Sequence, residues 1–99
     1  MVASNQRPIP LRKRADLVVA KIDYLGVGYQ VIKDPVALKY HRLQLEQYRI
    51  LELLNGKRSL ENVREDLKAE FPTLQITFSD IQQLITDLHK KGLVVSERP

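Results

Sequence analysis

The side chains that could do acid–base or metal chemistry are few in this chain, and they are not grouped. His41 and His89 are the two histidines, there is no cysteine, and no H-E-x-x-H motif occurs. A protein zinc site needs three or four ligands at short spacing, so we interpret both histidines as solvated or hydrogen-bonded surface residues. Ser59 and Ser79 have no base at a recognisable spacing and are better explained as helix caps. We therefore expect a protein that is not an enzyme and holds neither metal nor cofactor.

The net charge of +4 is concentrated at the start of the chain. Residues 1–21 hold five basic residues and one acidic residue, whereas the following 78 residues hold 11 of each. Residues 1–14 contain two prolines and no periodicity, so they are interpreted as an extended, solvated basic arm. Residues 15–96 are expected to form one small domain. Because the body of this domain is neutral, the charge disfavours nucleic acid as the main partner.

Apolar runs are short throughout the chain. None approaches the ~20 residues of a membrane span, and no apolar segment follows the basic residues near the N-terminus as a signal peptide requires. The absence of cysteine is compatible with a reducing compartment. A cytoplasmic location is the resulting expectation.

Short strands are predicted in the first half of the chain. The runs LVVAKIDY and GYQVIK are rich in Val, Ile and Tyr and are separated by a Gly-containing turn at Gly26, which predicts a β-hairpin over Leu17 to Lys33. Asp34-Pro35 breaks the second run, because proline lacks an N–H. A third strand is predicted over Val36 to Arg42, so that the three form an antiparallel sheet.

Three helices are predicted in the second half. The first begins near Leu43, directly after the third strand, and Asn55-Gly56 ends it. Ser59 is predicted to cap the second helix and Pro72 to end it, and Thr77 or Ser79 is predicted to cap the third. The third helix has apolar residues at the spacing i, i+3, i+4 and i+7, namely Ile81, Leu84, Ile85 and Leu88. A last short strand follows at Leu93-Val94-Val95, so the class is α+β, with a sheet followed by a bundle resembling a winged helix-turn-helix.

The central stretch of the chain resembles the PqqD-like family. Its residues follow the family pattern R-L-x6-I-L-x-L-x-[DN]-G-x-R-[ST]-x3-[IV], which begins at Arg42-Leu43 and ends at Val63. The ending Gly92-Leu93-Val94 is similar to the close of the family's last helix, and the match covers roughly residues 10 to 95. A related segment precedes the site-2-protease-like membrane metallopeptidases of some bacteria, so the chain is also considered as the N-terminal domain of a longer membrane-associated protein.

The resemblance implies a peptide-recognition element that brings a precursor peptide to a modifying enzyme, often a radical S-adenosylmethionine enzyme. In such a family the leader peptide adds as a strand beside the third strand and lies against the third helix. Carried over to this chain, the implied peptide-binding residues are Leu38, Lys39, Tyr40, His41, Arg42, Ile81, Leu84, Ile85 and Leu88. An exposed strand edge has unpaired N–H and C=O groups that suit this mode of binding.

Two other functions remain open at this point. In a DNA-binding winged helix the third helix would present Gln82, Gln83, Thr86 and Lys90, since glutamine reads adenine in the major groove. Alternatively, the same surface serves as a docking site within a larger membrane-associated protease or export protein. The identity of the ligand and the oligomeric state are not encoded in any motif.

Overall fold

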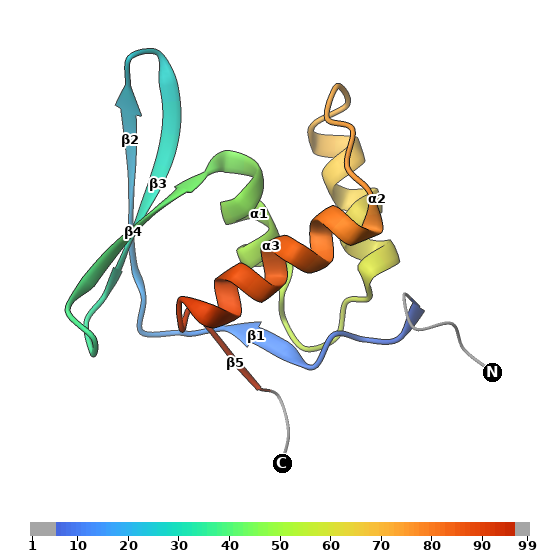
Figure 1. Ribbon diagram of the computed structural model, residues 1–99, viewed down its shortest axis with the longest axis horizontal. Helices are drawn as coiled ribbons and strands as arrows, with labels where there is room; N and C mark the ends of the chain where they lie inside the picture. Colours follow the sequence, from blue (N-terminus) through green and yellow to red (C-terminus); the bar gives the residue numbers. More distant parts are fainter. Residues whose placement is uncertain (1–5, 97–99) are drawn as a thin grey trace.

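A computed structural model describes residues 6–96, apart from the side chain of Tyr24. It is an α+β fold, as predicted, in which a three-stranded antiparallel sheet stands beside three helices (Figure 1). Residues 1–5 of the predicted basic arm and the last three residues lie outside the described part. The elements in chain order are β1 (Leu11–Lys13), β2 (Val18–Tyr24), β3 (Val27–Asp34), β4 (Lys39–Gln44), α1 (Leu45–Leu53), α2 (Leu60–Glu70), α3 (Phe78–Lys90) and β5 (Val94–Ser96).

The predicted hairpin is confirmed as β2 and β3, joined by a two-residue turn. Tyr24 is paired with Val27, so Leu25 and Gly26 alone form the loop. Both loop residues have positive φ, 51° and 79°, which is the backbone of a type I′ turn. This turn matches the right-handed twist of the two strands, but it places a leucine where asparagine, aspartate or glycine is preferred.

Exchange of Leu25 for asparagine is therefore expected to stabilise the protein. Leu25 is 86% exposed, so its side chain contributes little packing, while its left-handed backbone brings Cβ close to the following carbonyl oxygen and leucine has no polar group to offset this. We expect Leu25→Asn to raise the free energy of unfolding by about 0.5–1 kcal/mol in urea denaturation. Val36→Asn is the matched control, because Val36 is also exposed and in a turn but has no positive φ; an equal gain there would contradict the explanation.

The third strand of the sheet starts later than predicted. Residues 35–38 form the turn between β3 and β4, so the prediction of a strand from Val36 was wrong and Leu38 lies outside the strand. The reason is the turn chemistry of Asp34, whose Oδ1 accepts hydrogen bonds from the N–H groups of Val36 and Ala37 at 3.0 and 3.1 Å. Leu38 completes the turn with φ of 56°. Local hydrogen bonding by Asp34 thus outweighs the β-propensity of Val36.

The helix boundaries follow the predicted signals closely. As predicted, α1 follows β4 without a linker, although it begins at Leu45 because Leu43 is still part of the strand. The Ser59 hydroxyl caps α2 by accepting from the N–H of Asn62, and Thr77 with Asp80 forms a capping box at the start of α3. After α1, Gly56 takes a φ of 81°, which turns the chain toward α2.

The core lies between the sheet and the helices, around α1. It joins the helix-facing residues of β3 and β4, Ile32 and Leu43, to all three helices and to β5. The buried residues are Ile32, Leu43, Ile50, Leu51, Leu53, Leu54, Leu60, Val63, Leu67, Ile76, Ile81, Ile85, Leu88, Leu93 and Val94. A helix with buried residues on several sides is expected at the centre of such a domain.

The segment before the sheet joins the two ends of the described chain. β1 pairs with β5 in an antiparallel two-stranded sheet, with Leu11 opposite Ser96 and Lys13 opposite Val94. The same segment also bonds to the loop between α1 and α2, where the Ile9 N–H donates to the Arg58 carbonyl at 2.8 Å. Neither pairing was predicted from the sequence. The domain is thus held from residue 8 onward by backbone hydrogen bonds to its second half.

Arg14 ties three parts of the fold together. Its guanidinium contacts the carboxylates of Asp34 at 2.7 Å and Asp16 at 2.6 Å, and it donates to the carbonyl of Gly92 at 3.0 Å. Asp34 is buried, and its Oδ1 also accepts hydrogen bonds from the two turn N–H groups. These hydrogen bonds, chiefly the one from Arg14, lower the pKa of Asp34 to about 2.

This arrangement predicts a loss of stability in acid. Because the pKa of Asp34 is about 2 in the folded protein and 3.8 in its reference state, its contribution is complete above about pH 4 and is lost between pH 4 and 2. Asp34→Asn should therefore lower the midpoint of urea unfolding at pH 7 and flatten its decrease between pH 4 and 2. Glu70→Gln is the control, since Glu70 pairs with Arg49 in an exposed site; an unchanged acid profile in Asp34→Asn would contradict the assignment.

Candidate functional site

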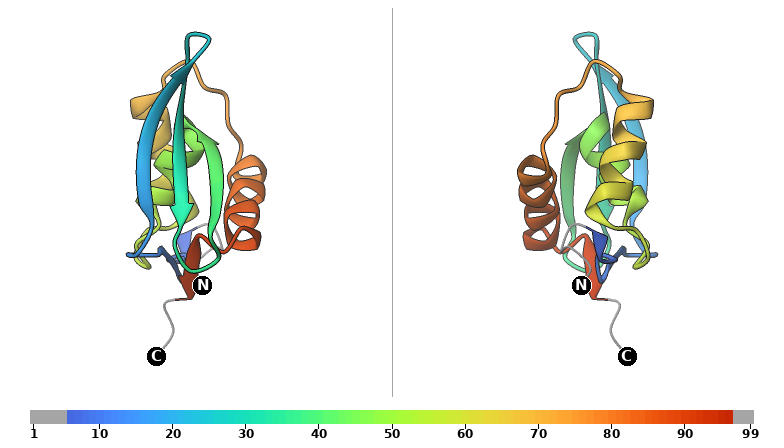
Figure 2. Two further views of the ribbon diagram at one scale, coloured as in Figure 1. Left: turned by 90° about the vertical axis from the view of Figure 1, so that its left-hand side faces the viewer. Right: turned by 90° about the vertical axis from the view of Figure 1, so that its right-hand side faces the viewer.

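The residues implied as a peptide-binding site are brought together only in part. Lys39 to Arg42 lie in β4, which is an outer strand of the sheet order β2-β3-β4. α3 lies beside β4, as both views of Figure 2 show. Leu38 is not in this strand but in the preceding turn, and its side chain is exposed. The strand edge and the helix of the predicted site are thus adjacent.

The free edge of β4 exposes the backbone of alternate residues. In a two-residue hairpin the closing pair, here Tyr24 and Val27, is hydrogen-bonded, and bonded and non-bonded pairs then alternate along the antiparallel strands. This places the backbone groups of Ile32 toward His41, and those of Tyr40 and Arg42 away from β3. Tyr40 and Arg42 therefore have N–H and C=O groups directed to the open edge.

The N–H of Gln44 agrees with this alternation. It is also directed away from β3, and the side chain of Gln47 binds it at 2.9 Å as part of the α1 cap. The open edge of β4 therefore ends where α1 begins.

The other outer strand, β2, is less suited to accept a further strand. Lys21 and Asp23 share the helix-facing side of β2 with Val19, since residues two apart point to the same face. Inward-pointing charges at a strand edge discourage pairing with another chain. The corresponding positions of β4 are Lys39, His41 and Leu43, of which Leu43 is buried. β2 thus has two charged residues on this side and β4 has one, Lys39, so β4 is the better candidate.

His41 lies on the helix-facing side of β4 near the end of α3. Its Nε2 is buried and has no hydrogen-bond partner within the described part of the chain. Burial, together with the positive charges of Lys91 and Lys39, lowers the pKa of His41 below 6.5 and outweighs the opposing effect of Asp34. His41 is therefore neutral at pH 7 and adds no charge to this part of the site.

The four α3 residues of the predicted site divide among three surroundings. Ile81 and Leu88 are fully buried and belong to the core. Leu84 is half-buried and packs against the edge of the core.

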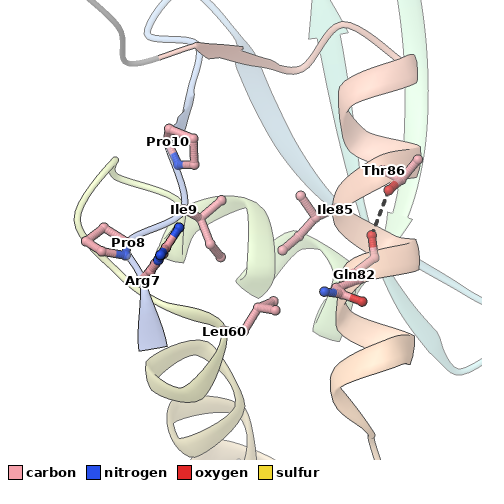
Figure 3. A pocket seen from close by; sticks show the side chains of 8 residues that line it. All are labelled: Arg7, Pro8, Ile9, Pro10, Leu60, Gln82, Ile85 and Thr86. Carbon is pink, nitrogen blue, oxygen red and sulfur yellow. Dashed lines mark hydrogen bonds between the residues drawn. The ribbon is translucent and has the colours of Figure 1, made fainter. Parts of the chain in front are cut away.

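Ile85 lies at a cavity of about 610 Å³ between α3, the start of α2 and the segment around Ile9. Figure 3 shows Ile9, Leu60 and Ile85 pointing toward one another at its base, with Gln82 and Thr86 at the rim. Thr86 Oγ1 donates to the Gln82 carbonyl at 2.9 Å, as the dashed line marks. This cavity was not predicted, because it depends on the segment around Ile9 crossing the bundle.

A second hollow lies on the outer face of the sheet, beside β4. This face is turned to the viewer on the left of Figure 2 and carries no helix. The hollow has a volume of about 330 Å³ and is lined by Ile22, Tyr29, Val31, Tyr40, His41 and Arg42. The Arg42 guanidinium lies 5.4 Å from the ring centre of Tyr29, and the Lys33 ammonium lies 5.9 Å from that of Tyr40. Two of the predicted site residues, Tyr40 and Arg42, therefore contribute to this hollow as well as to the open edge.

Groups for metal binding or membrane insertion are not found in the described part of the chain. Residues 6–96 contain no cluster of three or more His, Asp or Glu side chains that could hold a metal ion. Over the same residues, no helix is long and apolar enough to cross a membrane. This site can therefore bind a ligand by backbone hydrogen bonds and by contacts with apolar and cationic side chains.

One of the comparisons with known proteins finds a family for this chain. A family model described as PqqD, coenzyme PQQ synthesis protein D, matches residues 30–94, from the middle of β3 to the start of β5. The match includes β4, its open edge and all three helices. No match was found among curated proteins or among solved structures. Because the family model spans more than half of the chain, the protein belongs to the PqqD family.

Proposed function

We propose that this protein binds a peptide as an additional strand on the open edge of β4, beside α3. The observation that carries the proposal is the free backbone of Tyr40 and Arg42 on an outer strand. An added strand pairs its own N–H and C=O groups with these, which gives affinity without requiring a particular sequence. Side chains on the two faces of the added strand then select the ligand.

Membership of the PqqD family favours a peptide-recognition role in the modification of a precursor peptide. In this proposal the protein performs no chemistry itself and presents the peptide to a separate modifying enzyme. A cytoplasmic location, where a newly made precursor peptide is available, is part of the proposal.

We assign a scaffold role to the helical bundle, which we take to be winged-helix-like. Of the exposed polar residues of α3, Gln83 donates to Asp87 at 3.2 Å within the helix, and the basic residues lie at its end, His89 and Lys90 in the last turn and Lys91 at the C-cap. DNA affinity depends largely on basic side chains at phosphates, and this helix offers few. The peptide function is therefore preferred to DNA binding.

The proposal is tested by selecting random dodecapeptides by display on the immobilised protein and titrating the best binder into ¹⁵N-labelled protein. The expected result is that amide shifts change most at Lys39 to Arg42 and at Leu84. Shift changes centred on the cavity at Ile9, Leu60 and Ile85, with none along β4, would contradict the proposal. A selection that yields no binding peptide would also count against it.

A further inference from the structure

We propose that the outer-face hollow beside β4 is a side-chain subsite for the bound peptide, and that it selects a long apolar residue two positions from an acidic one. This inference rests on the proposed strand addition and extends it. The predicted site named residues on both faces of β4 but assigned no separate contacts to the outer face. The geometry points to a second set of contacts, on the opposite face of the sheet.

The first step is the alternation of side chains. A ligand residue opposite Tyr40 or Arg42 in the added strand directs its side chain to the same face as theirs, which is the outer face. The ligand residue between these two lies opposite His41 and faces α3. Two ligand residues, spaced by one, are therefore placed on the outer face whichever direction the added strand takes.

The second step is the shape of the hollow. Along β3 the outer face presents Tyr29 and Val31, and Val31 lies between Ala20 of β2 and Arg42 of β4. The short side chain of Ala20 leaves space over Val31, and the longer side chains of Tyr29 and Tyr40 line the sides of this space. Diagonal neighbours across strands are within reach of aromatic and other long side chains. An aromatic, leucine or methionine side chain of the ligand can therefore lean across β4 into this space.

The third step is charge. The outer-face residues whose side chains the structure describes are Val18, Ala20, Ile22, Val27, Tyr29, Val31, Lys33, Tyr40, Arg42 and Gln44. Two of these are cationic, Lys33 and Arg42, and none is acidic. The nearest carboxylate along β3, that of Asp34, is on the other face and bound by Arg14. An acidic ligand side chain thus meets positive charge without a competing carboxylate.

The orientation of Arg42 strengthens this preference. Its guanidinium is held 5.4 Å from the Tyr29 ring centre. A guanidinium stacked on a ring keeps its N–H groups free at the edge, where they can bind a carboxylate in a bidentate manner. The preference at the second outer position is therefore for aspartate or glutamate.

A charge exchange between protein and peptide tests the inference. The probe is the tightest dodecapeptide selected on the wild-type protein, together with a version in which the acidic residue spaced by one from its long apolar residue is replaced by lysine. We expect Arg42→Glu to weaken the original peptide about tenfold or more, and the lysine version to recover most of that loss. Lys21→Glu, which makes the same charge change on the opposite edge strand, should leave both peptides unchanged.

The other outcomes separate the two proposals. If Tyr40→Pro abolishes binding but Arg42→Glu leaves it unchanged, strand addition stands and the subsite is wrong. If neither substitution affects the peptide, strand addition fails and the subsite fails with it. If sedimentation shows a dimer that Arg42→Glu dissociates while the selected peptides are unchanged, the hollow is covered by a second copy of the chain, which overturns the inference.

Discussion

Replacement of Tyr40 by proline is expected to weaken peptide binding by about tenfold to a hundredfold. The substitution removes an N–H that faces the open edge of β4 and places a pyrrolidine ring where the added strand must lie. A single intramolecular or interfacial hydrogen bond contributes about 1 kcal/mol, which is about fivefold in Kd, and the steric effect adds to it. The measurement is isothermal titration calorimetry with the selected dodecapeptide.

Two control variants isolate the backbone effect. Tyr40→Ala removes the same side chain but keeps the N–H, so it should weaken binding less than Tyr40→Pro. Lys21→Pro removes an edge-facing N–H from β2 instead of β4, and it should not change the Kd. Tyr40→Pro is expected to remain folded, because Tyr40 and Lys33 are a non-hydrogen-bonded pair and no bond of the sheet is lost. Equal effects of Tyr40→Pro and Lys21→Pro would contradict the choice of β4.

Leu51→Ala is expected to have the largest effect on stability. Leu51 is fully buried in α1, at the centre of the core that joins the sheet to the other two helices. Truncation of a buried leucine costs about 2–5 kcal/mol, since apolar contacts are lost and a cavity remains. A domain of this size is stable by only about 5–15 kcal/mol, so the variant should lose a large part of its free energy of unfolding. Urea denaturation measures this loss as a lower midpoint.

Leu45→Ala is the matched control for this prediction. It makes the same truncation in the same helix, but Leu45 is 37% exposed and lies at the first turn. We expect a loss below about 1 kcal/mol for Leu45→Ala. Comparable losses in the two variants would show that α1 is not the central element of the core.

Features set by neighbouring residues were predictable from the sequence. Gly26 predicted the hairpin turn, and Ser59 and Thr77 predicted the helix starts. The apolar spacing from Ile81 to Leu88 predicted the buried side of α3. Each of these depends on bonds or packing within a few residues. The predicted start of β4 was three residues too early, because hydrogen bonds to the Asp34 side chain stabilise a turn that competes with strand formation.

Features that depend on distant partners were not predictable. The pairing of Leu11 with Ser96 joins two three-residue strands, and such short runs carry no periodicity that identifies a partner. The division of α3 followed from the same limitation. Helical spacing predicts that Leu84 and Ile85 lie near the buried side, but not that Ile85 lies at a cavity with Ile9. The outer-face hollow likewise required the register of three strands.

Hydrogen exchange at β4 tests the central claim most directly. In the free protein the amides of Tyr40 and Arg42 face the open edge and should exchange fast, while that of His41 should be protected by its bond to β3. On saturation with the selected dodecapeptide, we expect protection to rise at Tyr40 and Arg42 and to change little at Lys21 on β2. Saturated peptide that leaves the exchange of both β4 amides unchanged would contradict strand addition at this edge.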